Sequence, residues 1–278
     1  MGLTFSNPIG LAAGFDKRGA LVREMEALGF GAIEIGTVTP RPEPEHNPGV
    51  AALVATVSSA RNGGDAPRRI VQGISIGMNS DTPRERATDD YLAGLRAVWK
   101  YADYVAVNLS APAARYLGEP RWETSLSGLL ARLKDEQAVL ESGSARRLPL
   151  AVKIGLDPCF TDVPAIVRHV RDHHFDAIVA AVGPGDRGAD PAGPAGDRAT
   201  REHGTRSVRL LASFLEGSLA VISVGGILSP EDAAERLDAG ASLVQLYRGF
   251  ANGGPDLVRQ IIAFLADAEA APRPPRKN

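Results

Sequence analysis

One lysine stands inside an otherwise apolar segment, in the run Leu150-Ala-Val-Lys-Ile154. Strands of a parallel sheet are covered on both faces, so a lysine at this position needs a partner or a cavity. Near the end of a strand, the Lys153 ammonium could bind an anion or an electron-rich ring. The alternative is that its stem carries the charge out to solvent.

Glycines and one arginine follow two later apolar segments. The chain reads Ser223-Val-Gly-Gly-Ile227 and then Leu246-Tyr-Arg-Gly249. Backbone N–H groups of Gly225 and Gly226 are suited to an anion, and Arg248 adds a cation. In barrels of alternating strands and helices, the loops after the last two strands commonly bind phosphate. The pattern therefore predicts a phosphate site, provided that both segments end on the same side.

Two further polar residues follow apolar segments. Asn108 ends Tyr104–Asn108, and Lys17 follows the small residues Ala12-Ala-Gly14. The Asn108 amide could bind the edge of a ring or merely cap a turn. Lys17 could project over the same site or remain a solvated charge.

The elements that must position these residues alternate along the chain. Eight short apolar runs indicate buried parallel strands: 9–13, 31–36, 71–76, 104–108, 150–154, 177–181, 220–224 and 243–247. Amphipathic stretches between them indicate helices: 19–28, 85–99, 125–140, 163–173, 207–215, 230–239 and 255–266. Ser229 before Pro230 is a typical helix start. We predict an α/β fold with a single (β/α)₈ TIM barrel; a doubly wound open sheet is the alternative.

Two stretches interrupt this alternation. Residues 40–69 and 183–203 are rich in Gly, Pro and polar residues, and both follow the carboxyl ends of predicted strands. They could be binding loops of a barrel or disordered excursions.

Composition excludes several classes of protein. Of 278 residues, 44% are hydrophobic, and the formal net charge of −2 gives no reason to expect nucleic acid. No apolar stretch reaches the roughly 18 residues of a membrane span, and no metal-ligand spacing appears. Cys159 is the single cysteine, which excludes an internal disulfide and fits a cytoplasmic location. We expect one domain over residues 1–270, followed by a basic, proline-rich tail over 271–278.

Several of these segments together resemble the dihydroorotate dehydrogenases, most closely the quinone-using class. The resemblance covers about Leu3 to Leu257. It is carried by Asn7-Pro-Ile-Gly-Leu-Ala-Ala-Gly-Phe-Asp-Lys17, Glu34-Ile-Gly-Thr-Val-Thr-Pro-Arg-Pro42, Asn79-Ser-Asp-Thr-Pro83, Tyr101-Ala-Asp-Tyr104 and Ala239-Gly-Ala-Ser-Leu-Val-Gln-Leu-Tyr247. Because the sequence begins at the first predicted strand, we expect no counterpart of that class's N-terminal membrane helices.

The resemblance implies an FMN-binding (β/α)₈ barrel and assigns roles by position. The implied flavin contacts are Ala13, Gly14, Thr37, Asn108, Lys153, Gly225, Gly226 and Tyr247. Lys17 matches the lysine that holds the substrate carboxylate, and Asn108 also lies on the substrate side.

The departures from the family pattern fall mainly where the substrate would bind. The fourth-strand motif reads Asn108-Leu-Ser-Ala-Pro-Ala-Ala114, so Ala111 replaces the general base and Ala113 a substrate-binding asparagine. Val182 replaces the asparagine that reads the pyrimidine ring. A methyl group cannot accept a proton, and a general base typically contributes roughly 10²–10⁴-fold. Ser110, one residue off, should point elsewhere.

Other departures concern the flavin side and the identity of a substitute base. Ser75 stands for a flavin-facing asparagine, and Arg248 for a threonine near the phosphate. Ser110 and Cys159 are the weak candidates for a substitute base, and the family segment R-M-G-F-N-N has no clear counterpart between Val54 and Arg69.

We therefore expect an FMN-dependent oxidoreductase that acts on a small acidic substrate other than dihydroorotate. One alternative is a non-catalytic or partner-dependent barrel, within a homo- or hetero-oligomer. Another is a genuine dihydroorotate dehydrogenase with a substituted base.

Overall fold

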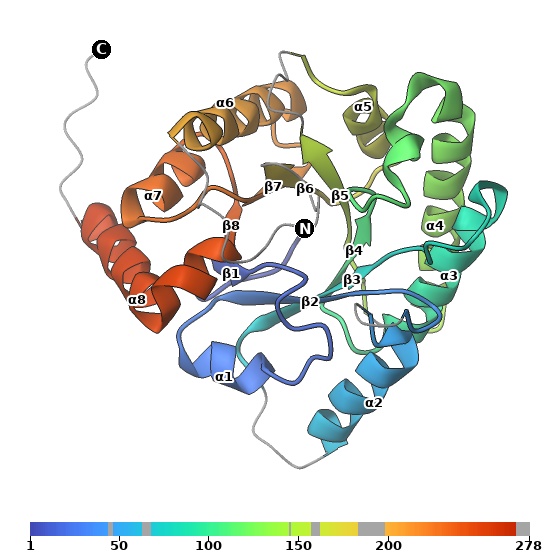
Figure 1. Cartoon of the computed structure of the whole chain (residues 1–278), viewed down its shortest axis with the longest axis horizontal. Coiled ribbons are helices and arrows are strands. Elements are labelled where there is room, and N and C mark those ends of the chain that lie inside the picture. The colour runs from blue at the N-terminus through green and yellow to red at the C-terminus, as the bar shows by residue number, and fades with distance from the viewer. Residues whose placement is uncertain (44–46, 63–67, 145, 157–161, 183–197, 271–278) are drawn as a thin grey trace.

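Eight parallel strands pair in chain order, and the last returns to the first (Figure 1). The computed structural model describes residues 1–43, 47–62, 68–144, 146–156, 162–182 and 198–270. The strands are β1 (Ile9–Leu11), β2 (Ala32–Val38), β3 (Val71–Ile76), β4 (Tyr104–Asn108), β5 (Leu150–Leu156), β6 (Ala177–Val182), β7 (Ala220–Val224) and β8 (Leu243–Leu246). Ile9 pairs with Val244, so the barrel is closed and the open-sheet alternative is wrong.

Helices surround the barrel (Figure 1). They are α1 (Val22–Ala27), α2 (Gly49–Asn62), α3 (Ala87–Val98), α4 (Glu123–Ser142), α5 (Ala165–Asp172), α6 (Arg198–Leu215), α7 (Pro230–Asp238) and α8 (Arg248–Ala270). Short 3₁₀ helices are η1 (Arg84–Arg86), η2 (Arg115–Gly118) and η3 (Pro120–Trp122). Within the described ranges, no helix combines the length and apolar character that a membrane crossing requires.

Alternation along each strand divides the buried side chains into two cores. Ile33 and Ile35 of β2 face the helices and belong to the larger core, whereas Ala32 belongs to the smaller core inside the barrel. Glu34 shares the parity of Ala32 and therefore also faces inward, with no exposed surface. The barrel interior is thus not wholly apolar.

Helix α2 lies within the stretch 40–69 that the sequence suggested was irregular. Its apolar residues Val50, Leu53, Val54 and Val57 follow helical spacing, and all four pack on the larger core. Polar and proline-rich flanks concealed this pattern. The prediction of an irregular connection is wrong for residues 49–62.

Helix α6 begins at Arg198, inside the second stretch that we considered irregular, 183–203. His203 is a buried helical residue only 6% exposed, and its Nε2 lies 3.2 Å from Ser207 Oγ. His203 therefore lies in a helix and not in an irregular loop. Residues 183–197 and the tail 271–278 lie outside the described residues, so their predictions stay untested.

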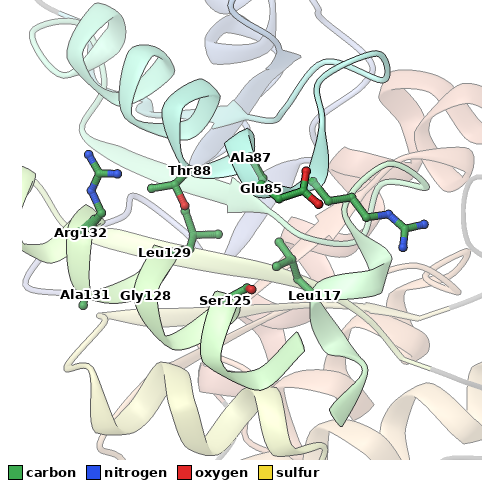
Figure 2. A pocket seen from close by; sticks show the side chains of 10 residues that line it. Glu85, Ala87, Thr88, Leu117, Ser125, Gly128, Leu129, Ala131 and Arg132 are labelled. Atoms are coloured by element: carbon green, nitrogen blue, oxygen red, sulfur yellow. The ribbon is translucent and has the colours of Figure 1, made fainter. Parts of the chain in front are cut away.

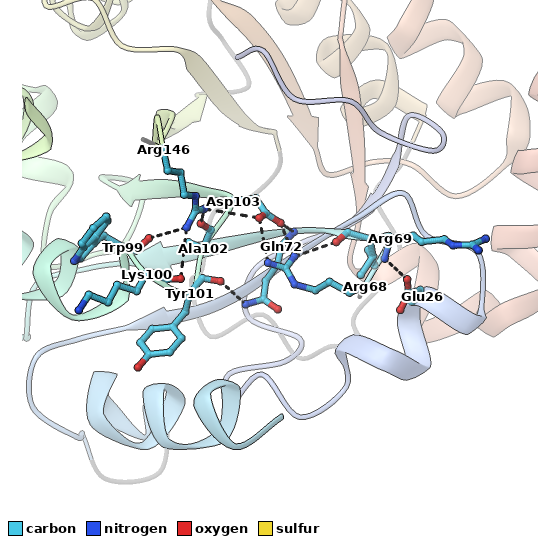
Figure 3. Close-up of polar contacts among 11 residues, drawn as sticks. Glu26, Arg68, Arg69, Gln72, Trp99, Lys100, Tyr101, Ala102, Asp103 and Arg146 are labelled. Atoms are coloured by element: carbon cyan, nitrogen blue, oxygen red, sulfur yellow. Dashed lines mark hydrogen bonds and ion pairs between the residues drawn. The ribbon is translucent and has the colours of Figure 1, made fainter. Parts of the chain in front are cut away.

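Asp103 ties together the amino-terminal ends of the strands (Figure 3). Its carboxylate accepts hydrogen bonds from the Gln72 backbone N at 2.8 Å and from the Arg68 guanidinium, while Arg146 Nη2 lies 3.8 Å away. These contacts link the starts of β3 and β4 to the chain that enters β5. Charged hydrogen bonds and ion pairs therefore hold together the amino-terminal end of the barrel, opposite the carboxyl end where the site is predicted.

Loss of the cap of α7 provides a test of the local folding signals. Ser229 Oγ accepts from Asp232 N at 3.2 Å, and the Asp232 carboxylate accepts from Ser229 N at 3.0 Å. We expect Ser229→Ala to lower the free energy of unfolding by about 1 kcal/mol, measured by urea denaturation. Ser59→Ala, at an exposed site in α2, is the control and should change it little.

Candidate active site

A chain of polar side chains joins the carboxyl ends of β2, β3 and β4. Asn108 Nδ2 donates to Thr37 Oγ1 at 2.9 Å, and Thr37 Oγ1 lies 2.9 Å from Ser75 Oγ. All three were predicted as flavin-side residues, and the barrel brings them together. Ser75 is shorter than the asparagine of the family pattern, yet its hydroxyl still reaches this chain.

Ser110 extends the same chain rather than turning away from it. Its hydroxyl donates to Asn108 Oδ1 at 2.7 Å, and its backbone N–H donates to the same oxygen at 2.9 Å. Asparagine commonly accepts from the residue two positions later. Our expectation that Ser110 points elsewhere is therefore wrong, and its hydroxyl lies beside the candidate site.

Lys153 is buried beside Asn108 rather than reaching solvent. The two residues pair across β4 and β5, and Lys153 is 8% exposed. Its Nζ lies 4.0 Å from Glu34 Oε1. The lysine inside the apolar strand thus has a buried partner, as the sequence indicated.

Glu34 belongs to a polar cluster inside the barrel that the sequence analysis missed. Its Oε2 accepts from the Tyr104 hydroxyl and from Gln245 Nε2, each at 3.0 Å. Burial, and then the charge of Glu34, raises the pKa of Tyr104, so the hydroxyl remains a donor. Glu34 Oε1 and Gln245 Oε1 have no hydrogen-bond partner in the described part of the chain. A glutamate and a glutamine at inward positions of predicted strands were the overlooked signal.

The loop after β1 is built on a buried carboxylate. Asp16 is 4% exposed, and its oxygens accept from the backbone N–H groups of Arg18, Gly19, Ala20 and Leu21 at 2.8–3.2 Å. This holds Lys17 at the carboxyl end of β1, where we expected it. Ala13 and Gly14 precede it, and a Cβ on Gly14 would meet Tyr247 Cε2 at 3.4 Å.

The ends of β7 and β8 provide the glycine-rich turn that the sequence suggested. Gly225 and Gly226 have positive φ values of 100° and 69°. A Cβ on Gly225 would lie 1.9 Å from Val182 O, so only glycine fits there. Gly249 packs against Ile227 O in the same way, which brings the start of α8, with Arg248, against this turn.

Asn47 is a second residue that the sequence analysis missed. Its Nδ2 donates to Thr37 O at 3.2 Å, and its Oδ1 accepts from Gly49 N at 3.0 Å, at the start of α2. An amide from the connection that precedes α2 therefore lies beside the Thr37 carbonyl. The Asn-Pro-Gly sequence before an apolar helical pattern was the available signal.

The apolar replacements lie on the loops and strand ends around this site. Ala111 O accepts from Ala114 N at 2.9 Å in the turn that leads into η2. Ala113 packs on the larger core, and Val182, 6% exposed, ends β6. Cys159, the other weak candidate for a base, lies outside the described residues.

A separate groove of 370 Å³ lies on the outer surface of the barrel, between α3 and α4 (Figure 2). Arg84, Thr88, Leu117, Ser125 and Arg132 are among its lining residues. None of the predicted site residues contributes to it. It is therefore a surface feature distinct from the candidate active site.

Comparison with known proteins agrees with this arrangement. The family model described as dihydroorotate dehydrogenase matches residues 1–48 and 45–268. This chain belongs to the dihydroorotate dehydrogenase family. The enzyme class that we predicted, a flavin-dependent oxidoreductase, and the predicted cofactor, FMN, are those of this family.

Individual relatives cover nearly the whole chain. Dihydroorotate dehydrogenase (quinone) of Stenotrophomonas maltophilia is 40% identical over 98% of this chain and 84% of its own length. The Azotobacter vinelandii protein of the same name is 42% identical over 96% and 83%. The ligand-free dihydroorotate dehydrogenase structure from Eimeria tenella is 25% identical, with a TM-score of 0.81 over 97% of this chain and 87% of that one.

The Glu34–Lys153 pair gives a direct test of the interior. Lys153→Met would leave a buried carboxylate facing no cation, so we expect the free energy of unfolding to fall by about 3 kcal/mol. Adding Glu34→Gln should restore part of that loss, because the unpaired charge is then gone. Urea denaturation of both single variants and the double variant measures the coupling. Strictly additive losses would show that the two side chains do not interact.

Proposed function

We propose that this chain binds FMN across the carboxyl ends of its strands and uses it to oxidise dihydroorotate, slowly, without the family's general base. The observation that carries the proposal is the polar chain Thr37–Ser75–Asn108 beside Lys153, with the turn Gly225–Gly226 farther around the same end of the barrel. FMN needs both parts, one for its ring and one for its phosphate.

The residues present fit this cofactor. Gly14 leaves space beside the Tyr247 ring. A side chain at Gly225 would clash with Val182 O, and Gly226 has a positive φ that glycine adopts most easily. Asn108 and Lys153 would hold the polar edge of the ring, with Ala13, Thr37 and Ser75 beside them. The glycine pair and Arg248 would hold the phosphate. FMN, when bound, supplies the acceptance of a hydride.

Dihydroorotate is the substrate that the comparisons support. Relatives 40–42% identical to this chain are named for that substrate and for a quinone as acceptor, and none of those described above is named for another acid. Our expectation of a different substrate therefore lacks support, and a dihydroorotate dehydrogenase with a substituted base fits better. In this proposal Lys17 and Asn108 bind the substrate, and a quinone is the acceptor to test first.

Proton removal is the step for which this chain is poorly equipped. The methyl group of Ala111 accepts no proton. The Ser110 hydroxyl donates to an amide oxygen, which is too weak a base to activate it. We therefore place the deficit of this enzyme in the proton transfer rather than in flavin binding. Two further points, the cytoplasmic location and the assembly into a homo- or hetero-oligomer, remain predictions from the sequence.

Restoring a base should raise turnover. We expect Ala111→Cys or Ala111→Ser to increase kcat for dihydroorotate by roughly 10²–10⁴-fold, because a thiolate, or a hydroxyl that passes its own proton to water, can take the substrate proton. Steady-state oxidation with a quinone acceptor measures it, and Ala111→Val, which adds bulk but no acceptor, is the control. An unchanged kcat in FMN-loaded Ala111→Cys and Ala111→Ser would contradict the assignment of position 111.

A second pair of measurements separates slow catalysis from no catalysis. If the Ser110 hydroxyl takes part in the residual turnover, Ser110→Ala should lower kcat for dihydroorotate below the wild-type value. The flavin absorption band should stay intact. A wild-type protein that carries FMN but turns over no dihydroorotate would favour the non-catalytic barrel. Purified protein with no flavin band, even after FMN is added, would remove the proposal altogether.

A further inference from the structure

Arg236 is the largest fully buried side chain in the described part of the protein. It lies on α7, and only 1% of its surface is exposed. Charged side chains are almost never buried to this degree unless they are paired, because removing a charge from water is costly. The buried charge of Arg236 therefore needs a partner that stabilises it.

The hydrogen bonds of the Arg236 guanidinium go to neutral acceptors. Nη1 donates to Ser223 Oγ at 2.8 Å, Nε to Thr205 Oγ1 at 3.2 Å, and Nη2 to Arg201 O at 3.3 Å. Burial lowers the Arg236 pKa to about 10, which leaves the group charged at neutral pH, and the charges of Asp232 and Glu235 only partly oppose this.

Nearby Asp232 is occupied elsewhere. Its Oδ2 accepts from the backbone N–H groups of Leu228 and Ser229, at 2.9 and 3.0 Å. Its Oδ1 lies 3.7 Å from Arg201 Nη1. Within the described residues, the buried guanidinium therefore has no carboxylate among its hydrogen-bond acceptors.

The guanidinium lies against the glycine turn at the end of β7. A Cβ on Gly226 would be 3.2 Å from Arg236 Nη2, and a Cβ on Gly204 would be only 1.9 Å from it. Ser223, which accepts from Nη1, lies on β7 two residues before Gly225. The charge is thus placed beneath the turn whose backbone N–H groups suit an anion.

We propose that Arg236 is a buried positioning residue for an anionic phosphate at Gly225–Gly226, supplying its counter-charge from below without contacting it. The inference rests on the proposed binding of FMN, whose phosphate carries about two negative charges at neutral pH. Because Arg236 is buried, salt screens its field much less than that of a charge at the surface. Its bonds to Ser223 of β7 and to Thr205 and the Arg201 carbonyl of α6 also hold the turn that follows β7 against α6.

Comparing FMN with riboflavin isolates this effect, because the two ligands differ only in the phosphate. We expect Arg236→Gln to weaken FMN binding by about tenfold, which corresponds to about 1.4 kcal/mol, and to change riboflavin binding much less. Arg236→Lys keeps the charge and should retain most of the affinity for FMN. Flavin fluorescence on titration of the flavin-free protein gives both dissociation constants.

Arg206→Gln is the matched control, since it removes the same charge from an exposed position on α6. It should leave the ratio of FMN to riboflavin affinity unchanged. In Arg236→Gln, the ratio of FMN affinity to riboflavin affinity should stay below the wild-type ratio at high salt. A difference caused by a surface charge would fade as salt is added. Equal losses of FMN and riboflavin affinity in Arg236→Gln, or an unchanged ratio, would overturn the proposal and leave Arg236 a structural residue.

Inorganic phosphate provides a readout that does not depend on flavin. We expect it to raise the Tm of the flavin-free wild type and to raise that of Arg236→Gln less, each relative to its own value without phosphate. If the wild type bound neither flavin, the proposed function would fail. A rise in Tm with phosphate that is larger in the wild type than in Arg236→Gln would still support an anion site at Gly225–Gly226. Equal rises in both proteins, or no rise in either, would overturn the role proposed for Arg236.

Discussion

The rest of the structure depends on one buried carboxylate inside the barrel. Glu34 on β2 gains its partners only when Tyr104 on β4 and Gln245 on β8 donate to Oε2 and Lys153 on β5 faces Oε1. A buried charge without partners is costly, so these four strands must close in this register. A slip of one residue would turn Glu34 toward the helices. The same contacts that specify closure also hold the Lys153 ammonium beside Asn108, at the end of the barrel where the ring of the cofactor is proposed to lie.

The side chains proposed to hold the polar edge of the flavin ring and the positions of the missing base and asparagine have different structural origins. Thr37, Ser75, Asn108 and Lys153 belong to strands, and their contacts are part of the barrel. Ala111 and Ala113 belong to the connection that follows β4, where a change of side chain leaves the strands undisturbed. Barrel enzymes vary their chemistry in such connections while the fold persists. This separation explains how a chain can keep a flavin site and yet lose its general base.

Sequence reasoning succeeded where burial alone decides structure. The ends of β3, β4 and β7 agree with prediction, because apolar runs covered on both faces stop sharply at polar or turn residues. It failed at α2, whose apolar spacing is flanked by proline and asparagine, and at the charged first turns of α6. The burial of Arg236 could not be foreseen either, since a charged residue in an amphipathic helix is usually on its solvent face. Only the packing of α6, α7 and β7 around it reveals that position.

The fit between Gly73 and Tyr104 limits how this barrel can change over time. A Cβ on Gly73 would lie 2.2 Å from Tyr104 Cζ, so the glycine exists to admit the ring. Any substitution at residue 73 must be matched by a smaller residue at 104, and that would deprive Glu34 of a donor. The three positions should therefore vary together among descendants or not at all. A library that varies residue 73 alone should therefore lose most of its folded members, because every larger side chain there meets the Tyr104 ring.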